Sequence, residues 1–560
     1  MIILHDANTS DLSHIQAIAK IEEGFALFDY VSIKQTNDMS WIGQIVQPNQ
    51  NISTVGGRLD PTILHGLELM QKHTDIQSVE SVQVFDILIL GQYDEKTMLT
   101  PRLRPLPGAV VSKLDADTTS KVISIPTKFT HPNGNSNVIG ELLNADNVPL
   151  CITEEKFNYH ISISGGTGSG KSNAAANLIY QALNYGKCVL VHDAKPDYGL
   201  VHQENSDPLV ADIWKQFEKY GLKAKGADKV KRVGFYGKCD PQKVNIVVGF
   251  RASDFSPEML GSLFFFGSSN SAEQNAFEGF VNAADAVRQR KKEYTLDDIL
   301  QEVVRRSDTN NPVAAMDAIH VETGKSIQRK VNNRRKGMPW LDVVGRKVAA
   351  QSTNRFKGSQ LDGETKSVQA FNLESFVGKS VLLVIDYAQM NEQSYALILS
   401  YFLRICHQYR RKRSDIGIVQ MVDEAHRIFD NESRHNTSLS RSFEHVMREG
   451  RSVDHSIMLS LQNASQIPPR VMNNLNTKIV MRQNSKHEAD AATQTMGKDF
   501  SPQSMRLGTG HALVSVHESR AIVLAQMAPS PFDLMRNDNT KSSKPQQTGV
   551  NTSEEDDSDF

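Results

Sequence analysis

A glycine-rich stretch from Gly165 to Ser172, GGTGSGKS, has the residue types needed to hold phosphate groups. In the pattern G-x-x-x-x-G-K-[ST], the glycines let successive backbone NH groups point at phosphate oxygens where a helix begins. We expect Lys171 to contact the β- and γ-phosphates of a nucleoside triphosphate and Ser172 to bind Mg²⁺. The predicted cofactors are therefore ATP and Mg²⁺, and the predicted nucleotide contacts are Gly166, Thr167, Gly168, Ser169, Gly170, Lys171, Ser172 and Asn173.

An acidic pair follows a second apolar strand, GIVQMV, which ends in Asp423 and Glu424. This position suits the carboxyl end of a parallel sheet, where ligands bind. We expect Asp423 to hold Mg²⁺ through water, and Glu424 to orient or deprotonate the water that attacks the γ-phosphate. Acids at a helix N-terminus would explain the pair equally well without the phosphate loop. The presence of the loop favours the nucleotide interpretation.

Three further polar residues are candidates for supporting roles. Asp193 ends the strand KCVLVHD, which we expect to lie beside the phosphate-loop strand. Gln462 ends the strand SIMLSLQ, where a sensor of the γ-phosphate would lie. Arg451, in MREGRS, is the candidate arginine finger that inserts into a neighbouring subunit's site. At all three positions, a solvent-facing polar residue is the alternative.

The strand and helix patterns divide the chain into four parts. Short strands predict a small β-barrel in residues 1–125, interrupted by a helix near residues 61–72. Alternating strands and helices predict an α/β core with a mostly parallel sheet, formed by residues 126–204 and 346–535. Helical periodicity predicts an insertion of helices over residues 205–345. The polar, acidic residues 536–560 are expected to be disordered.

Composition excludes several classes of protein. With 39% hydrophobic and 22% charged residues, the chain is typical of a globular enzyme. It has no apolar run of roughly 18 residues and no signal peptide at its start, so we expect a cytoplasmic protein without a membrane partner. Its four cysteines are widely spaced, which suggests neither a disulfide framework nor a cysteine zinc site.

The motifs together resemble those of the HerA family of motor ATPases. This resemblance implies a RecA-like P-loop core, an N-terminal barrel of the HerA and ATP synthase type, and a homo-hexameric ring with ATP at the subunit boundaries. Tyr159 is a departure, because the family often has a basic residue there. Matching stretches are 105–111, 159–173, 189–199, 422–429, 448–468 and 508–516, and the functional residues carried over are Lys171, Ser172, Asp193, Asp423, Glu424, Arg451 and Gln462.

The resemblance also implies partners. HerA-like motors move along or unwind DNA and work with a nuclease or an anti-phage effector, such as a Sir2-like NAD-hydrolysing subunit. Three basic clusters, at 288–292, 329–336 and 410–413, would contact DNA if they line the pore of a ring, although a charge run is usually a solvated face. The alternatives are an ATP-dependent scaffold that activates a partner enzyme, and a conjugation or secretion ATPase.

Overall fold

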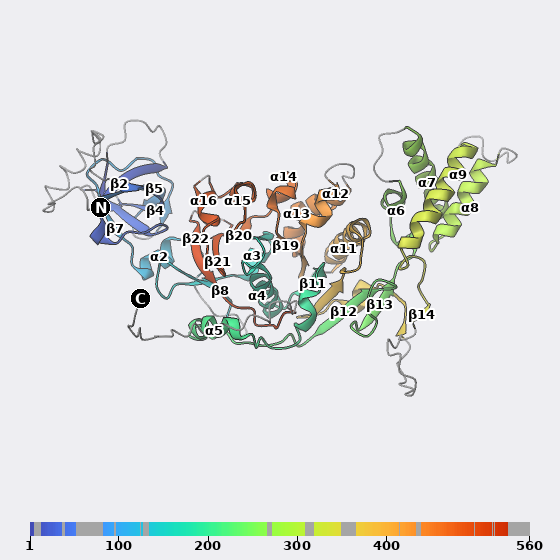
Figure 1. Cartoon of the computed structure of the whole chain (residues 1–560), viewed down its shortest axis with the longest axis horizontal. Helices are drawn as coiled ribbons and strands as arrows, with labels where there is room; N and C mark the ends of the chain where they lie inside the picture. The colour runs from blue at the N-terminus through green and yellow to red at the C-terminus, as the bar shows by residue number, and fades with distance from the viewer. Residues whose placement is uncertain are drawn as a thin grey trace, which may run out of the picture.

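The chain folds into three bodies placed in a row, which are a β-barrel, a large α/β unit and a group of helices (Figure 1). The predicted helix at 61–72 and the predicted disordered tail at 536–560 lie outside the described residues. The computed structural model describes residues 1–4, 13–35, 40–51, 82–94, 97–123, 125–126, 134–265, 271–308, 318–348, 366–413, 415–432, 438–497, 499–517, 519 and 521–535.

The N-terminal body is a closed barrel, as the alternating apolar strands predict. Pairing of β2 with β5 closes the sheet order β2-β1-β7-β3-β4-β5-β6 on itself. Trp41, Ile33 and Phe85 fill the interior and are almost completely buried. Its strands are β1 (Ile2–Ile3), β2 (His14–Lys20), β3 (Tyr30–Lys34), β4 (Ser40–Asn51), β5 (Val82–Tyr93), β6 (Met98–Leu99) and β7 (Val110–Lys113).

The barrel is joined to the α/β unit by polar and aromatic contacts. The Tyr30 hydroxyl and the Gln44 amide both donate to the Ile522 carbonyl oxygen, at 3.2 and 2.6 Å. The Phe28 ring stacks on Phe500 at a centroid distance of 5.9 Å. Because these groups are buried, separating the two bodies would leave the carbonyl and both donors without partners.

The central body is built on a 13-stranded sheet in the order β16-β13-β12-β17-β11-β18-β19-β10-β20-β21-β22-β8-β9. Strands from β16 to β20 are parallel to their neighbours, and the remaining pairings are antiparallel. The predicted α/β core with a mostly parallel sheet is thereby confirmed. Its strands are β8 (Val138–Leu142), β9 (Pro149–Cys151), β10 (Ile161–Ser164), β11 (Cys188–Asp193), β12 (Val230–Phe235), β13 (Ile246–Gly249), β16 (Gln369–Ala370), β17 (Leu382–Asp386), β18 (Ile418–Val422), β19 (His455–Leu461), β20 (Thr477–Met481), β21 (His511–Ser515) and β22 (Val523–Met527).

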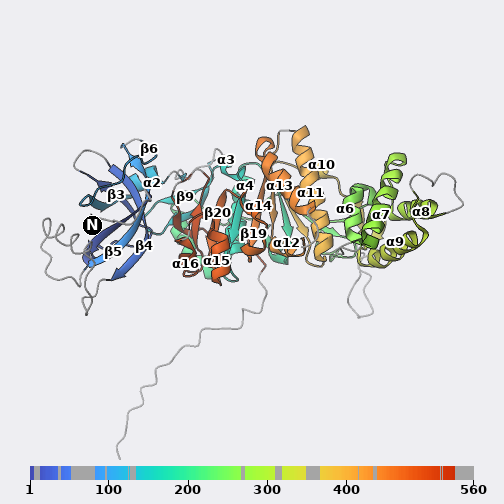
Figure 2. The ribbon, with the colours of Figure 1, turned by 90° about the horizontal axis from the view of Figure 1, so that it is seen from above.

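Both faces of this sheet are covered, so its parallel strands read as continuous apolar runs. In β11, Val189 and Val191 pack into one core with Leu178 of α4 (Lys171–Asn184). Leu190, which alternates with them, belongs to the second core, which includes Phe402 of α11 (Glu392–Lys412). Figure 2 shows α11, α13 (Ser438–Glu449) and α14 (Pro469–Met472) over the sheet.

The strand order corrects one prediction. We expected β11 to lie beside the phosphate-loop strand β10, but β18 and β19 stand between them. Consecutive strands often pair, yet the apolar β18 and β19 are buried on both faces and so occupy the centre of the sheet. Asp193 still ends at the same sheet edge as the loop, because all four strands are parallel.

The segment 205–345 is not purely helical, which is a second correction. It contributes β12 and β13 to the edge of the central sheet before the chain enters the helices. Short, β-branched runs such as IVVG form strands here because a sheet edge is available for pairing. The helical part is narrower and comprises α6 (Pro257–Phe264), α7 (Ser271–Arg290), α8 (Leu296–Ser307) and α9 (Val321–Arg334), followed by the hairpin of β14 (Lys347–Val348) and β15 (Lys366–Ser367).

A capping box starts α8. The Thr295 hydroxyl accepts from the Asp298 NH, and the Asp298 carboxylate accepts from the Thr295 NH. Every helix in the described ranges is too short or too polar to cross a lipid bilayer. The remaining helices are α2 (Ala116–Val122), α3 (Glu154–Phe157), α5 (Ala211–Glu218), α10 (Leu373–Phe376), α12 (His426–Glu432), α15 (Lys486–Thr493) and α16 (Phe500–Ser504).

Candidate active site

The glycine-rich loop connects the end of β10 to the start of α4. Gly170 precedes the first residue of α4 with φ +103°, and Gly168 has φ +75°. Residues with a side chain strongly disfavour such positive φ angles, which explains why glycine occupies these two positions. The free NH groups at the start of a 14-residue helix attract anions. The loop therefore has the backbone form of a phosphate cradle.

Four polar side chains converge on the carboxylate of Glu424. Its Oε1 lies 3.6 Å from Lys171 Nζ and 2.8 Å from Lys195 Nζ. The Gln462 amide donates to the same oxygen at 2.8 Å, and His426 Nε2 lies 3.3 Å from Oε2. The structure thus brings Lys171, Glu424 and Gln462 together, although they come from three separate strand ends.

The backbone of Glu424 is strained, with φ +49°. A non-glycine residue in this left-handed region costs free energy and is common at functional sites. The turn reverses the chain immediately after β18, so that Glu424 points at the phosphate loop. Its side chain is only 4% exposed, and water therefore does little to screen its charge.

The lysines keep the Glu424 carboxylate ionised. Burial alone opposes ionisation, but the charges of Lys171 and Lys195 outweigh it and hold the pKa of Glu424 below its usual value. His426 adds a contact that needs no positive charge, because its Nδ1 accepts from the Gln462 NH, which leaves Nε2 to donate. An ionised carboxylate at this position is able to accept a proton from an attacking water.

The other carboxyl groups nearby are poorly compensated. Burial and the charge of Glu424 together raise the pKa of Asp423 to about 6, although Lys171 opposes the rise. Burial and the charge of Asp423 raise the pKa of Asp193 well above its usual value. The Asp193 carboxylate accepts from the Tyr198 NH through Oδ2, and its Oδ1 has no partner among the described residues.

The donor set fits a divalent cation. The Ser172 hydroxyl donates to Asp197 Oδ2 at 3.2 Å, beside the acidic pair. Four carboxyl groups, those of Asp193, Asp197, Asp423 and Glu424, surround two lysines, Lys171 and Lys195. Mg²⁺ prefers carboxylate and hydroxyl oxygens, and its charge would offset the excess of acids. The roles of Ser172 and Asp423 as its ligands stay predictions.

The remaining residues of the phosphate loop differ in exposure and in the contacts that they make. Thr167 and Gly168 are exposed at the tip of the loop, whereas Ser169 is buried. Asn173 faces away from the acidic cluster, because its Oδ1 accepts from the Ser530 NH at 2.8 Å. In the structure its side chain therefore fastens α4 to the segment after β22, and its predicted nucleotide contact stays a prediction.

Arg451 lies at the opposite edge of the sheet. It belongs to the short 3₁₀ helix η8 (Gly450–Val453), immediately before β19, while Gln462 follows β19. The seven residues of β19 separate the two edges by roughly 20 Å. The Arg451 guanidinium lies 4.1 Å from the Tyr159 ring centroid, and that ring stacks on His517. Arg451 cannot reach the phosphate loop of its own chain.

Three site residues were missed by the sequence predictions, namely Lys195, Asp197 and His426. All three lie just beyond the carboxyl ends of β11 and β18. Lys195 and Asp197 stand in AKPDYG, directly after Asp193, and the signal for them was this run of charged residues at the predicted sheet edge. His426 is on α12 and contacts Glu424 only because of the strained turn.

Comparisons with known proteins find matches over the same region. Residues 137–405 match the family model described as "Helicase HerA, central domain", which includes the phosphate loop and ends before Asp423. The probable helicase MJ1565 of Methanocaldococcus jannaschii is 25% identical over 180 residues, which are 29% of this chain and 33% of the relative. This chain therefore spans about a third of the length of that curated relative.

Two solved structures are similar at low sequence identity. The plasmid coupling protein TrwB in complex with ADP and Mg²⁺ is 11% identical, with a TM-score of 0.46 and coverage of 75% of this chain and 96% of that chain. VirB4 of Thermoanaerobacter pseudethanolicus is 13% identical, with a TM-score of 0.43 and coverage of 70% of this chain and 96% of that chain.

The raised pKa of Asp423 predicts that Asp423→Asn stabilises the nucleotide-free protein at pH 7.5. The pKa of this acid is about 6 in the folded protein and 3.8 in the unfolded chain. Its protonated form therefore stabilises the folded state fully below pH 3.8, and this stabilisation is lost as the pH rises through 6. The ionised form therefore costs up to about 3 kcal/mol, which asparagine removes. Thermal unfolding would show a higher Tm for the variant at pH 7.5, and a smaller difference from wild type at pH 5.

The control is Asp212→Asn, because Asp212 is fully exposed on α5 beside Lys215. We expect no gain in Tm from that change at either pH. An Asp423→Asn variant that is less stable than wild type at pH 7.5 would mean that Asp423 is compensated by charges other than those described.

Proposed function

Because residues 137–405 belong to the family described as helicase HerA, central domain, we propose that this chain is a ring-forming ATPase that couples ATP hydrolysis to movement along DNA. One observation carries the proposal. The buried Glu424 carboxylate lies 3.6 Å from the phosphate-loop lysine, Lys171, and is held ionised by two lysines. A charged base beside a phosphate cradle is the arrangement that hydrolysis of a triphosphate requires.

In the proposed reaction each residue has a distinct task. The loop NH groups and Lys171 bind the phosphate oxygens, and Ser172 and Asp423 hold Mg²⁺, which when bound neutralises developing negative charge on the phosphates. Glu424 accepts a proton from water at a carboxylate oxygen, while Gln462 keeps that carboxylate in place through its 2.8 Å hydrogen bond. Lys195 offsets the negative charge that remains on the site.

We propose that Arg451 acts on the site of a neighbouring subunit. Its place at the amino ends of the strands prevents a contact with its own phosphate loop, as the length of β19 shows. In a cyclic ring, unlike faces of adjacent subunits meet, so that one subunit's amino edge can face the next subunit's carboxyl edge. A homo-hexamer is the assembly we propose, and stacking on Tyr159 holds the guanidinium before it engages.

The proposed DNA contacts are exposed cations of the helical body. Within the described part of the chain, Arg290, Lys291, Lys330 and Arg335 are paired with carboxylates. Arg288, Lys292, Arg329 and Lys336 are exposed, and the described residues give them no carboxylate partner. Such cations attract phosphates without reading sequence, which suits a motor that must move along any DNA.

We also propose a protein partner, either a nuclease or a Sir2-like NAD-hydrolysing effector. Single exposed apolar side chains are ordinary, but a group of them marks a contact surface. On the segment from β6 to β7 of the barrel, Leu99, Leu103, Leu106 and Val110 are each 50 to 58% exposed. This part of the barrel is the surface to which we assign the partner.

The proposed base predicts the behaviour of Glu424→Gln. The amide keeps the shape of the side chain but cannot accept a proton, so turnover should fall by about 10² to 10⁴-fold. ATP should still bind, because Lys171 and the loop NH groups are unchanged. Phosphate release and binding of a fluorescent ATP analogue measure the two properties. As a control, Glu141→Gln changes a buried glutamate on β8 and should leave turnover intact.

The proposed trans contact predicts complementation between two inactive variants. Lys171→Ala and Arg451→Ala should each abolish most ATP turnover, the second without loss of ATP binding. Mixed at equal amounts, they should regain activity, because about one quarter of random interfaces would pair an intact loop with an intact arginine. The Lys171→Ala/Arg451→Ala double variant is the control and should rescue neither partner. Absence of any regain in a demonstrably mixed ring would contradict the trans role.

Movement along DNA predicts that duplex DNA stimulates ATP turnover by wild-type protein. Replacing Arg288, Lys292, Arg329 and Lys336 with alanine should reduce that stimulation and its salt dependence, since fewer counterions are then released from the phosphates. The control replaces Lys215 and Lys225, two exposed lysines outside the helical body. Turnover that does not respond to DNA would support a nucleotide-dependent scaffold instead.

A further inference from the structure

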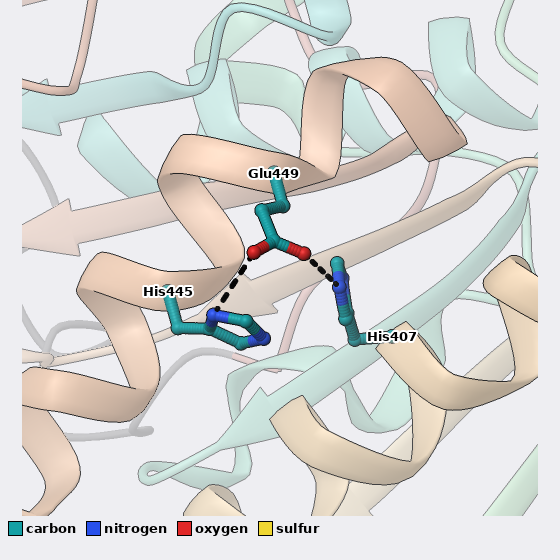
Figure 3. A group of neighbouring side chains, drawn as sticks. All are labelled: His407, His445 and Glu449. Carbon is teal, nitrogen blue, oxygen red and sulfur yellow. Dashed lines mark hydrogen bonds and ion pairs between the residues drawn. The ribbon is translucent and has the colours of Figure 1, made fainter.

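Three side chains with metal-binding atoms meet on the side of the central body away from the nucleotide site. His407 is on α11, and His445 and Glu449 lie one turn apart on α13 (Figure 3). One ligand atom from each lies within 4.8 Å of the other two. The Glu449 carboxylate stands between the imidazoles, with Oε2 3.4 Å from His407 Nε2 and Oε1 3.5 Å from His445 Nδ1.

These separations are too long for strong ion pairs. Charge-assisted N–H···O contacts are usually about 2.7 to 2.9 Å. The same helix provides an example, since Arg448 lies 2.6 Å from Glu444. In contrast, tetrahedral ligands at about 2.1 Å from a metal ion are about 3.4 Å apart. The two separations from Glu449, one to each of its oxygens, are therefore close to that of ligands around one ion, and the three ligand atoms all lie within 4.8 Å of one another.

The surroundings also suit a cation. His407 is 4% exposed and is held by the packing of α11 against α13, whereas His445 and Glu449 are 55% and 48% exposed. The cluster is thus anchored on one side and open to water on the other. The nearby Arg410 points elsewhere, because its guanidinium donates to the carbonyl oxygens of Val453 and Ile416.

We propose that His407, His445 and Glu449 form a binding site for a divalent transition metal, with Zn²⁺ as the preferred ion and water as the fourth ligand. Two imidazoles and one carboxylate match the borderline-soft character of Zn²⁺ and are poor ligands for Mg²⁺, which prefers oxygen. The site is separate from the nucleotide site, which lies at the carboxyl edge of the sheet.

The ion would also restrain the candidate arginine finger, a consequence that rests on the proposed function. Glu449 directly precedes η8, which carries Arg451 two residues further on. A metal bond to Glu449 fastens the end of α13 to α11 and so limits movement of η8. Bound metal should therefore change the ATP turnover of the assembled ring through Arg451, without touching the nucleotide.

Metal binding itself can be tested on the full chain without any activity. Protein stripped with a chelator is titrated with Zn²⁺ by calorimetry in the absence of nucleotide, and retained metal is counted by elemental analysis. We expect about one Zn²⁺ per chain and a rise in Tm on binding. His445→Ala and Glu449→Gln should each weaken binding by at least about 10- to 100-fold and remove the rise in Tm.

His487→Ala is the matched control, because His487 is also exposed on a helix, α15, but is outside the cluster. This variant should bind Zn²⁺ as wild type does. Equal Zn²⁺ binding by wild type, His445→Ala and Glu449→Gln would overturn the site, as would no binding by wild type. Normal Zn²⁺ binding with DNA-independent turnover would instead leave the metal site standing and contradict the proposed motor.

Discussion

The contact between the Lys171 ammonium and the Glu424 carboxylate is the interaction on which the rest of the site depends. Both side chains are nearly buried, so water does little to screen the attraction between their charges. They meet because β10 and β18 are parallel members of one sheet and end at the same edge. The strained turn at Glu424 completes the contact, whereas the neighbouring acids, Asp193 and Asp423, are poorly compensated by positive charge.

The two edges of the sheet have different chemistry. The carboxyl edge gathers the phosphate loop, the acids and two lysines, whereas the amino edge holds Arg451 against Tyr159. The basic residue expected at position 159 is replaced by an aromatic ring that supports an arginine from another segment. If Arg451 acts in trans as proposed, one chain holds two parts of a reaction centre that it cannot combine by itself, which is the physical argument for the proposed ring.

Buried polar residues cross the sheet between these edges. His192 Nε2 lies 2.9 Å from Gln420 Oε1, and Gln420 Nε2 lies 2.8 Å from His455 Nε2. The two ends of the amide fix opposite tautomers in the two histidines. The His455 ring is 5.8 Å from His407, so this row ends beside the proposed metal site. Hydrogen bonds between specific polar partners in an apolar core favour one strand register over others.

The local sequence was enough for the elements and for the centre of the site. A glycine-rich turn before a helix is typical of an anion cradle, and its presence favoured a ligand-binding edge over a helix N-terminus for the acidic pair, so the meeting of Lys171 and Glu424 was predictable. The barrel was predictable from alternating apolar residues, because its strands are buried on one face. The central sheet was predictable from continuous apolar runs, because its parallel strands are buried on both faces.

Only the tertiary structure decided which strands are neighbours and which distant side chains meet. The position of β11, the recruitment of β12 and β13 to the sheet, and the contact of His407 with Glu449 all depend on long-range packing. Local strand propensity does not determine these choices, because the same residues are compatible with several strand pairings. Arg451 is a further example. Its sequence motif suggested a role as an arginine finger, but only the parallel order of the strands places it roughly 20 Å from its own phosphate loop.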